Sequence, residues 1–215
     1  IAQKLDALLG PSDLEGLNLL VTAGPTREHI DPARFISNPS TGRMGIAIAE
    51  AARDRGANVT LVLGPTTIQV PSGIHVHRIQ STQDMLEVCH QNFAECDVWI
   101  MSAAPADYKP AQEHQHKVKK TNGSMTHLEL EKTPDILSNL QKIQTHQFIV
   151  GFAAESRDVI NYAREKLQRK KLDMIVANDI SNSDTGFASS TNAVTLIAKD
   201  GTEENIALAP KRDIA

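Results

Sequence analysis

The sequence predicts an α/β fold, namely a Rossmann-like, doubly wound and mostly parallel sheet between helices, with an antiparallel C-terminal extension. Two observations support this fold class. From residue 17 onward, short runs rich in apolar and β-branched residues alternate with longer runs of helical periodicity, which is typical of a parallel sheet with crossover helices. Near the end, two β-like runs flank Asp200 and Gly201, a pair that favours a tight hairpin turn and therefore antiparallel strands.

The element boundaries follow from periodicity and from capping residues. Ser81 with Asp84 fits a helix N-cap, and Gly56 fits a C-cap. Thr133 followed by Pro134 fits an N-cap and the first turn of a further helix. We expect helices at 43–55, 81–96, 133–144 and 156–171, strands at 17–23, 58–63, 75–79, 98–102, 147–152, 173–178, 193–198 and 204–208, and a short strand outside the regular series at 126–131.

Composition limits the class of protein. The 215 residues, 40% of them hydrophobic, suffice for one sizeable core. The 22 Lys and Arg against 26 Asp and Glu give a net charge of −4, which lacks the basic field that nucleic acid or an anionic membrane requires, so any cationic site must be local. The apolar runs fall far short of a membrane span and no leader pattern opens the chain. We therefore expect a cytoplasmic protein that binds neither nucleic acid nor membranes.

Cysteine and histidine give no sign of a metal site. Cys89 and Cys96 fall within one helical pattern, and we expect them to be core thiols because no zinc-binding spacing accompanies them. His114 and His116 lie in a polar stretch, and we assign them no role.

Both ends look like cuts from a longer protein. Residues 1–9 follow a helical period and then meet Gly10 and Pro11, so they resemble the end of a preceding unit. The residues from Pro210 onward look like a helix start abandoned after barely one turn.

The connection after the first strand is the first candidate for a ligand site. It runs from Thr22 to Gly45, whereas roughly two to six residues are usual in an α/β unit. It ends in the segment STGRMG at 40–45, where free backbone N–H groups, a helix dipole, two hydroxyls and Arg43 favour phosphate.

Two other nucleotide-binding classes fit less well. A nicotinamide dehydrogenase would need G-x-G-x-x-G, of which only the latter half is present. The second strand also ends at Gly64 without the acid that would hold a ribose hydroxyl. A P-loop is excluded because no glycine-Lys-Ser/Thr run occurs.

The segment SAAPADYKP at 102–110 is the second candidate loop. Its small residues let a ligand approach the backbone, and Asp107 supplies a carboxylate at a strand end. Lys117, Lys119 and Lys120 follow a polar stretch, which forms either a mobile flap or a solvated surface loop.

Two later segments complete the set. VGFAAE at 150–155 joins a strand to a helix, where Phe152 and open backbone amides either hold a base or serve packing. Lys166 and Lys170 share a helix face by their i, i+4 spacing and repel each other unless an anion neutralises them. Asn178 places a carboxamide at another strand end. Because these loops meet at one edge of a parallel sheet, the sequence predicts a polyphosphate site there.

The motifs of these loops resemble one known family. TAGPTREHID, ISNPSTGRMG, SAAPADY, KVKK, TPDIL, VGFAAE and ANDI occur in the order seen in phosphopantothenoylcysteine synthetases, and the resemblance spans roughly 17–215. It implies a ligase of coenzyme A biosynthesis. CTP would activate the carboxylate of 4′-phosphopantothenate as an acyl-cytidylate with loss of pyrophosphate, and L-cysteine would then form the amide and release CMP.

The resemblance also implies residue roles. Asn38 would hold the acyl-phosphate intermediate or its oxyanion, and Lys117 would stabilise charge on the α-phosphate. Ala103 and Ala104 would offer close backbone contact near the reacting carbonyl, and Asp107 would bind CTP or its divalent cation, Mg²⁺ or Mn²⁺. The expected nucleotide-binding residues are Ser40, Gly42, Met44, Gly45, Asp107, Lys117, Pro134, Asp135, Ile136, Leu137, Phe152, Lys166 and Lys170, and the expected substrate-binding residues are Asn38, Ala103, Ala104 and Asn178.

The resemblance finally implies partners and domain organisation. Bacterial members are commonly fused behind a flavin-dependent decarboxylase, so we expect 1–16 to be a linker from that absent domain, which alone would carry FMN. Residues 17–215 would be the ligase domain, truncated at its C-terminal end. We also expect a homodimer, with the Lys117 flap or the extension at 193–208 at the interface. A non-catalytic nucleotide sensor is the alternative class of function, and the retained Lys117 and Asn38 argue against it.

Overall fold

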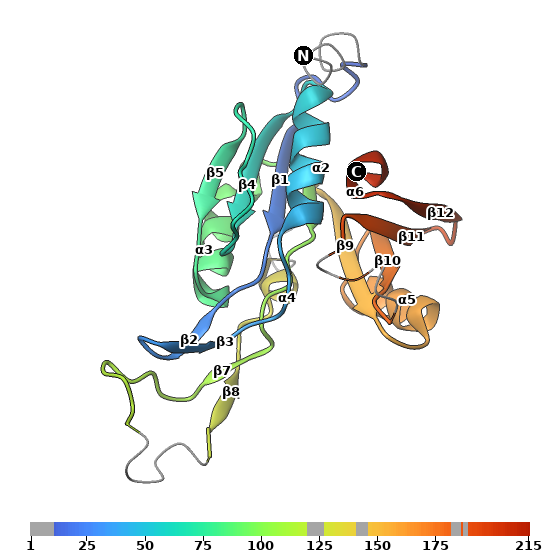
Figure 1. The fold of residues 1–215 in the computed structure, drawn as a ribbon. Coiled ribbons are helices and arrows are strands. Elements are labelled where there is room, and N and C mark those ends of the chain that lie inside the picture. The colour runs from blue at the N-terminus through green and yellow to red at the C-terminus, as the bar shows by residue number, and fades with distance from the viewer. Residues whose placement is uncertain (1–10, 120–126, 141–145, 182–185, 187–188) are drawn as a thin grey trace.

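A computed structural model describes residues 11–119, 127–140, 146–181, 186 and 189–215 (Figure 1). Its centre is a single eight-stranded sheet, parallel from β10 to β5, to which the last two strands add in antiparallel orientation. The predicted fold class is therefore confirmed. The strand order is β12 (Glu203–Pro210), β11 (Thr191–Ala198), β10 (Met174–Asp179), β9 (Phe148–Glu155), β6 (Val98–Met101), β1 (Asn18–Ala23), β4 (Asn58–Leu63) and β5 (His75–Arg78).

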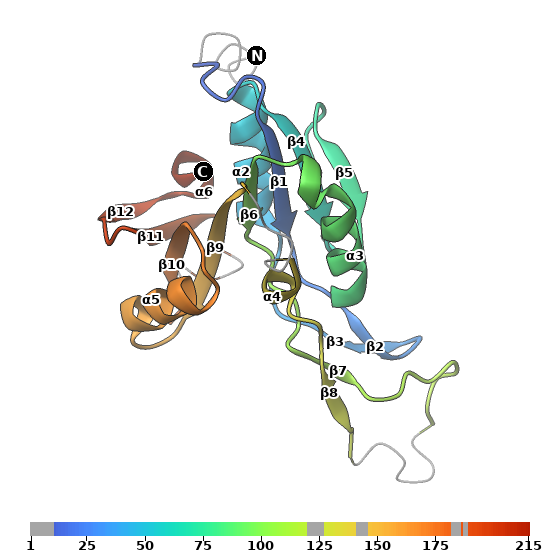
Figure 2. The same cartoon turned by 180° about the vertical axis from the view of Figure 1, so that it is seen from behind.

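Helices cover both faces of this sheet (Figures 1 and 2). α2 (Arg43–Asp54) and the short α6 (Lys211–Ile214) lie on one face. The other face carries α3 (Thr82–Asn92), α4 (Ile136–Leu140) and α5 (Val159–Arg169). Alternation within β1 explains why both faces are apolar, since Leu19 and Val21 pack under α2 while Leu20 packs under α3.

The strand order reverses between β1 and β6, which places a crevice at their carboxyl ends. The chain leaving β1 stays beside the chain leaving β6, because Pro25 and Ala104 form a parallel bridge and the Ala104 N–H donates to the Gly24 carbonyl at 2.9 Å. The two connections that the sequence marked as candidate loops therefore meet at the switch point.

Both predicted ends of α2 and the predicted start of α3 are confirmed, whereas the helix predicted at 156–171 is shorter and spans Val159–Arg169. Ser81 and Asp84 form a reciprocal capping box at α3, and Gly56, with φ of 93°, follows the end of α2. The helix predicted from 133 begins instead at Ile136, because the Asp135 carboxylate accepts the Ser138 N–H at 3.1 Å. Residues 141–144 of that prediction lie outside the described residues. The predicted helix 81–96 ends as a 3₁₀ turn, Phe93–Glu95.

Two small strand pairs, which we call the arm, project from the carboxyl edge of the sheet (Figure 1). They are β2 (Glu28–Asp31) with β3 (Arg34–Ile36), and β7 (Tyr108–Pro110) with β8 (Leu130–Lys132). β2, β3 and β7 were not predicted from the sequence, and the strand predicted at 126–131 overlaps β8 only in part, with residue 126 outside the described residues.

The prediction of an open loop at 150–155 was wrong. β9 continues to Glu155, because residues as far as 155 pair in parallel with β10 as far as Asp179. The backbone amides expected to be open there belong to the sheet. The hairpin prediction is confirmed, with Gly201 at φ 91° between β11 and β12.

Two further expectations can be compared with the described residues. Cys89 and Cys96 are buried in the core, as predicted, whereas His114 and His116 are exposed. Within the described ranges, the longest and most apolar helices fall short of what crossing a bilayer requires.

Candidate functional site

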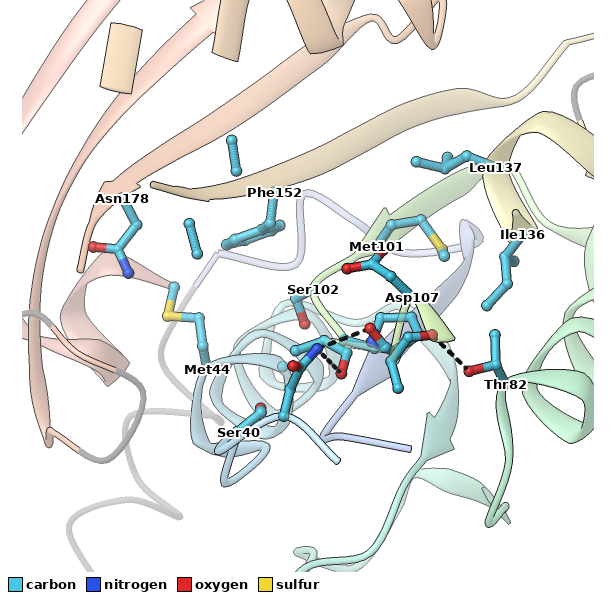
Figure 3. A pocket seen from close by; sticks show the side chains of 18 of the residues that line it. Ser40, Met44, Thr82, Met101, Ser102, Asp107, Ile136, Leu137, Phe152 and Asn178 are labelled. Carbon is cyan, nitrogen blue, oxygen red and sulfur yellow. Dashed lines mark hydrogen bonds between the residues drawn. The ribbon is translucent and has the colours of Figure 1, made fainter. Parts of the chain in front are cut away.

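A cleft of about 860 Å³ opens at the carboxyl edge of the sheet, across the switch point (Figure 3). This volume falls within the roughly 300–1,000 Å³ of ligand sites. All predicted site residues except Lys117 line it. They are Asn38, Ser40, Gly42, Met44, Gly45, Ala103, Ala104, Asp107, Pro134, Asp135, Ile136, Leu137, Phe152, Lys166, Lys170 and Asn178.

Lys117 lies on an exposed stretch beside the arm and does not line this cleft. The neighbouring Val118 fixes that stretch to the β2–β3 turn. Its N–H donates to Asp31 Oδ2 at 3.2 Å, and its carbonyl accepts from Arg34 Nη2 at 3.3 Å. Lys119 is exposed as well, and Lys120 lies outside the described residues.

The turn before α2 is built for close backbone approach. Gly42 adopts φ of 78° at the N-cap, a conformation that side chains rarely take. Gly45 packs so tightly that a Cβ there would lie 2.4 Å from Ser102 Oγ and 2.5 Å from Ala23 Cβ. The first turn of α2 thus sits directly on the end of β1 and on Ser102, the residue after β6, and the start of the helix lines the cleft.

Asn38 and the alanine pair form the middle of the cleft. The Asn38 side-chain amide donates to the Pro105 carbonyl at 2.9 Å and to the Ala104 carbonyl at 3.3 Å. The Ala103 N–H donates to Thr22 Oγ1 at 3.2 Å, and the Ala104 N–H is bonded to β1's connection. Because both alanine amides are already engaged, these residues can offer a ligand close approach rather than free donors.

Lys166 and Lys170 each bind a different partner within the chain. Lys166 Nζ donates to the Phe152 carbonyl at 2.7 Å, and burial lowers its pKa against the opposing effect of Glu155. Lys170 pairs with Asp135 and also donates to Ser138 Oγ at 2.8 Å. Their predicted mutual repulsion is thus relieved in part by a carboxylate of the chain itself.

The pair of Lys170 and Asp135 also sets the charge of Asp135. Burial would raise the pKa of Asp135, but the Lys170 ammonium and the hydrogen bonds from Ser138 keep it below its ordinary value. The Asp135 carboxylate therefore stays ionised at neutral pH, and its pair with Lys170 braces α4 against α5 on one wall of the cleft.

Asp107 is the residue expected to bind a divalent cation. Its surroundings suit an ion that is coordinated by both the protein and the nucleotide, rather than one enclosed by protein ligands. It is exposed and lines the cleft. No group of three or more His, Cys, Asp or Glu close enough to hold a metal occurs in the part of the chain that the structure describes. A single carboxylate fits Mg²⁺, which commonly takes one or two protein carboxylates and completes its octahedron with substrate phosphates and water.

Several lining residues were missed by the sequence analysis, and they make the cleft cationic. Asn192 of β11 and Lys211, the first residue of α6, are both buried there. The basic lining residues are Arg43, Lys132, Lys166, Arg169, Lys170 and Lys211, against the acidic Asp107, Asp135 and Glu155. A chain of net charge −4 thus has a local excess of positive charge at this site.

The fold and the cleft together define a class, a Rossmann-like α/β domain with a cationic cleft at its switch point. The chain belongs to the family described as the DNA/pantothenate metabolism flavoprotein C-terminal domain, which matches residues 14–215.

Relatives match along most or all of the chain. The Coenzyme A biosynthesis bifunctional protein CoaBC of Bacillus subtilis (strain 168) is 44% identical over 216 residues, which cover 100% of this chain and 53% of that protein. CoaBC of Escherichia coli (strain K12) is 43% identical over 193 residues, which cover 88% of this chain and 48% of that protein. The chain thus spans about half the length of the curated relatives it matches.

Solved structures agree with the fold. A crystal structure of the C-terminal domain of CoaBC superposes with a TM-score of 0.80 at 42% identity, covering 94% of this chain and 91% of that one. A Cab2 mutant in complex with phosphopantothenate-cysteine has a TM-score of 0.72 at 15% identity, covering 99% of this chain and 87% of that one, which is a likeness of fold alone.

Proposed function

We propose that the chain is a phosphopantothenate–cysteine ligase domain, which joins 4′-phosphopantothenate to L-cysteine in coenzyme A biosynthesis at the expense of CTP. The observation that carries the proposal is the convergence of separate sequence motifs on one cationic cleft at the switch point. The relation of the whole chain to CoaBC proteins supports the same function.

The reaction has two balanced steps. A carboxylate oxygen of 4′-phosphopantothenate attacks the α-phosphorus of CTP, the bond to the β-phosphate breaks, and pyrophosphate leaves. The amine of L-cysteine then attacks the acyl carbon, loses a proton and expels CMP. Such chemistry depends on alignment and on neutralising phosphate charge more than on acid–base groups, which suits a cleft rich in cations and backbone contacts.

The residues divide this work by position. The turn at 40–45 would hold phosphates, Lys166 and Lys170 would complete the nucleotide site near the base, and Asn38 would orient the reacting carbonyl beside Ala104. Asp107 would share a divalent cation with the nucleotide, and that ion would supply charge neutralisation on the phosphates. Lys117 would act at the α-phosphate after its loop moves, or in the cleft of a second copy.

Selection of CTP would come from the wall formed by Phe152 and residues 134–137. These residues line the same end of the cleft as Lys170, which Asp135 holds in place. Backbone groups of residues 134–137 would read the exocyclic amine and the ring acceptors of cytosine, whereas Phe152, whose backbone is paired within the sheet, would offer its ring. We expect a clearly higher kcat/KM for CTP than for ATP, and equal values would contradict this part of the proposal.

Pyrophosphate release tests the ligase directly. Purified chain should release pyrophosphate only when 4′-phosphopantothenate and CTP are both present, and added L-cysteine should yield 4′-phosphopantothenoylcysteine and CMP in equal amounts. A dehydrogenase or a non-catalytic sensor would release none. Absence of pyrophosphate from a folded chain with Mg²⁺ or Mn²⁺ would refute the function.

We also propose a homodimer formed through the arm. Four of the six large exposed hydrophobic side chains in the described residues lie on or beside it, namely Phe35, Tyr108, Leu128 and Leu130. A second copy would cover them and bring the Lys117 loop of one chain near the other. Light scattering at micromolar concentration should give twice the chain mass, and a fully active monomer would contradict the dimer.

The full-length protein would add a second activity. We propose a fused decarboxylase domain carrying FMN before this chain, with residues 1–16 as the linker, and a cytoplasmic location. Within that segment, Leu14 packs beside Leu17 on the core under α2, and Asp13 pairs with Arg55 at 2.6 Å. The linker would therefore end against the ligase domain rather than hang free of it.

A further inference from the structure

Lys211 is the most deeply buried cation of the cleft. It begins α6 directly after β12, and only 5% of its surface is exposed. Its N–H donates to the Ser190 carbonyl at 2.9 Å, and its Nζ donates to the Gly186 carbonyl at 3.1 Å. The antiparallel extension therefore holds an ammonium group at the edge of the sheet where the parallel strands end.

A second cation stands beside it. Arg43 is the first residue of α2, is exposed and lines the same cleft. In the described part of the chain, no carboxylate forms an ion pair with its guanidinium. Arg43 and Lys211 begin α2 and α6, two helices that contact each other, and both residues line the cleft, so their charges lie near each other. Burial lowers the pKa of Lys211, and the charge of Arg43 lowers it further.

This pair lies apart from the lysines of α5. α2 and α6 contact each other on one face of the sheet, whereas α5, with Lys166 and Lys170, covers the other face (Figures 1 and 2). Lys170 also has a carboxylate partner in Asp135, which Arg43 lacks among the described residues. The cleft thus has a second cationic end beside the turn at 40–45, and two repelling cations there are stabilised by an anion.

We propose that Lys211 and Arg43 bind the β- and γ-phosphates of the nucleotide, the part that departs as pyrophosphate. The inference rests on the proposed function and extends it to Lys211, which the sequence did not predict at the site, and it assigns Arg43 to particular phosphates. A polyphosphate laid across the start of α2 meets backbone amides first and then this pair, so the terminal phosphates would be bound more tightly than the nucleoside monophosphate part.

The test compares ligands that differ only in these phosphates. Calorimetry on the chain with Mg²⁺, and without 4′-phosphopantothenate, would measure binding of CTP, CMP and inorganic pyrophosphate. Lys211→Met keeps the side-chain length and removes the charge. It should weaken CTP and pyrophosphate by about 10- to 100-fold, the value of a charge-assisted hydrogen bond, and leave CMP within about 2-fold.

Arg212→Met is the matched control. It removes the same charge one residue further on, where the guanidinium faces Glu50 at 3.9 Å and Asp54 at 3.8 Å instead of the cleft. Its CTP affinity should stay normal. Arg43→Gln, at an exposed position, gives the same comparison if Lys211→Met unfolds, and Lys211→Arg should recover part of the CTP affinity.

The outcomes separate the two proposals. Equal losses for CTP and CMP, or an unchanged CTP affinity in both Lys211→Met and Arg43→Gln, overturn the inference. Another outcome is that the variants lose affinity for CTP but not for CMP while the unsubstituted chain releases no pyrophosphate with 4′-phosphopantothenate. That result supports the inference and counts against the ligase. A chain that binds no CTP overturns both.

Discussion

The side-chain amide of Asn38 donates a hydrogen bond of 2.9 Å to the carbonyl oxygen of Pro105. It also lies 3.3 Å from the Ala104 carbonyl, so one carboxamide ties the connection after β1 to the connection after β6. The amide expected to meet an acyl-cytidylate is thus directed at backbone carbonyls. Donation to a ligand requires exchange of the longer of these two bonds, the one to Ala104.

Asn38→Asp should separate the two half-reactions. A carboxylate has no N–H to donate, and it repels both the backbone carbonyls and the phosphate of the intermediate. Activation depends on the phosphate-binding groups and should survive better than amide formation, which depends on orientation at the carbonyl. Quenched reactions analysed by mass spectrometry should contain 4′-phosphopantothenoyl-CMP even with L-cysteine present. Normal product formation, or equal loss of both steps in a folded variant that binds CTP, would show that Asn38 has another role.

The fold was predictable because its signals are local. The alternation of strands and helices, the capping box at Ser81 and the hairpin at Asp200 and Gly201 all depend on nearby residues. The arm was not predictable in this way. β3 spans three residues and β7 contains Pro110, so pairing with distant partners rather than β propensity decides their structure.

The cleft was predictable where loops follow parallel strands, and less so elsewhere. Phe152 lines the cleft as predicted, but the predicted loop around it does not exist. Pairing with β10 extends β9 through that segment, and this pairing cannot be seen in the local sequence. Lys211 was missed although a signal existed. The predicted hairpin returns the chain to the carboxyl edge, where Thr191 pairs with Pro210, and the next residue must then face the loops of the parallel strands.

Both thiols should be unreactive in the folded chain. Burial raises the pKa of Cys96 to about 11, with Asp97 adding to the effect, and burial raises the pKa of Cys89 further. A thiolate is the reactive form, so a thiol reagent at pH 8 should label neither residue natively and both in denaturant. Rapid native labelling of either cysteine would contradict the burial and would reopen the question of a protein thiol in the reaction.

Lys117→Gln should slow the activation step by about 10²–10³, by analogy with other groups that stabilise developing charge. CTP binding should change less, because Lys117 lies outside the cleft of its own chain and acts only when brought to the α-phosphate. Stopped-flow measurement of pyrophosphate formation checks this directly, with Lys109→Gln as a control for loss of an exposed charge on the arm. Near-normal pyrophosphate formation would remove Lys117 from the mechanism.

Asp31 should control where Lys117 can go. Its buried carboxylate accepts the Val118 N–H at 3.2 Å, the Ala33 N–H at 2.8 Å and the Arg34 guanidinium at 3.1 Å. Burial alone would raise its pKa, but these donors keep the pKa of Asp31 below its ordinary value. The hydrogen bonds to the ionised Asp31 carboxylate are therefore fully formed above the ordinary pKa of an aspartate. They are lost only as the pH falls through the lowered pKa of Asp31, so they persist throughout the neutral range.

Asp31→Ala should therefore release the stretch that carries Lys117 at every pH between about 6 and 9, since the native carboxylate stays ionised there. Trypsin should cut after Lys117 and Lys119 faster than in the unsubstituted chain, because cleavage follows local opening. Pyrophosphate formation should fall by about 10-fold, the lower value for a lost hydrogen bond to a charged group, because a released stretch no longer holds Lys117 in place for the cleft of a second copy. Asp13→Ala, which breaks only an exposed pair with Arg55, is the control and should change neither rate. Faster cleavage with unchanged pyrophosphate formation would mean that the reaction does not depend on this anchor.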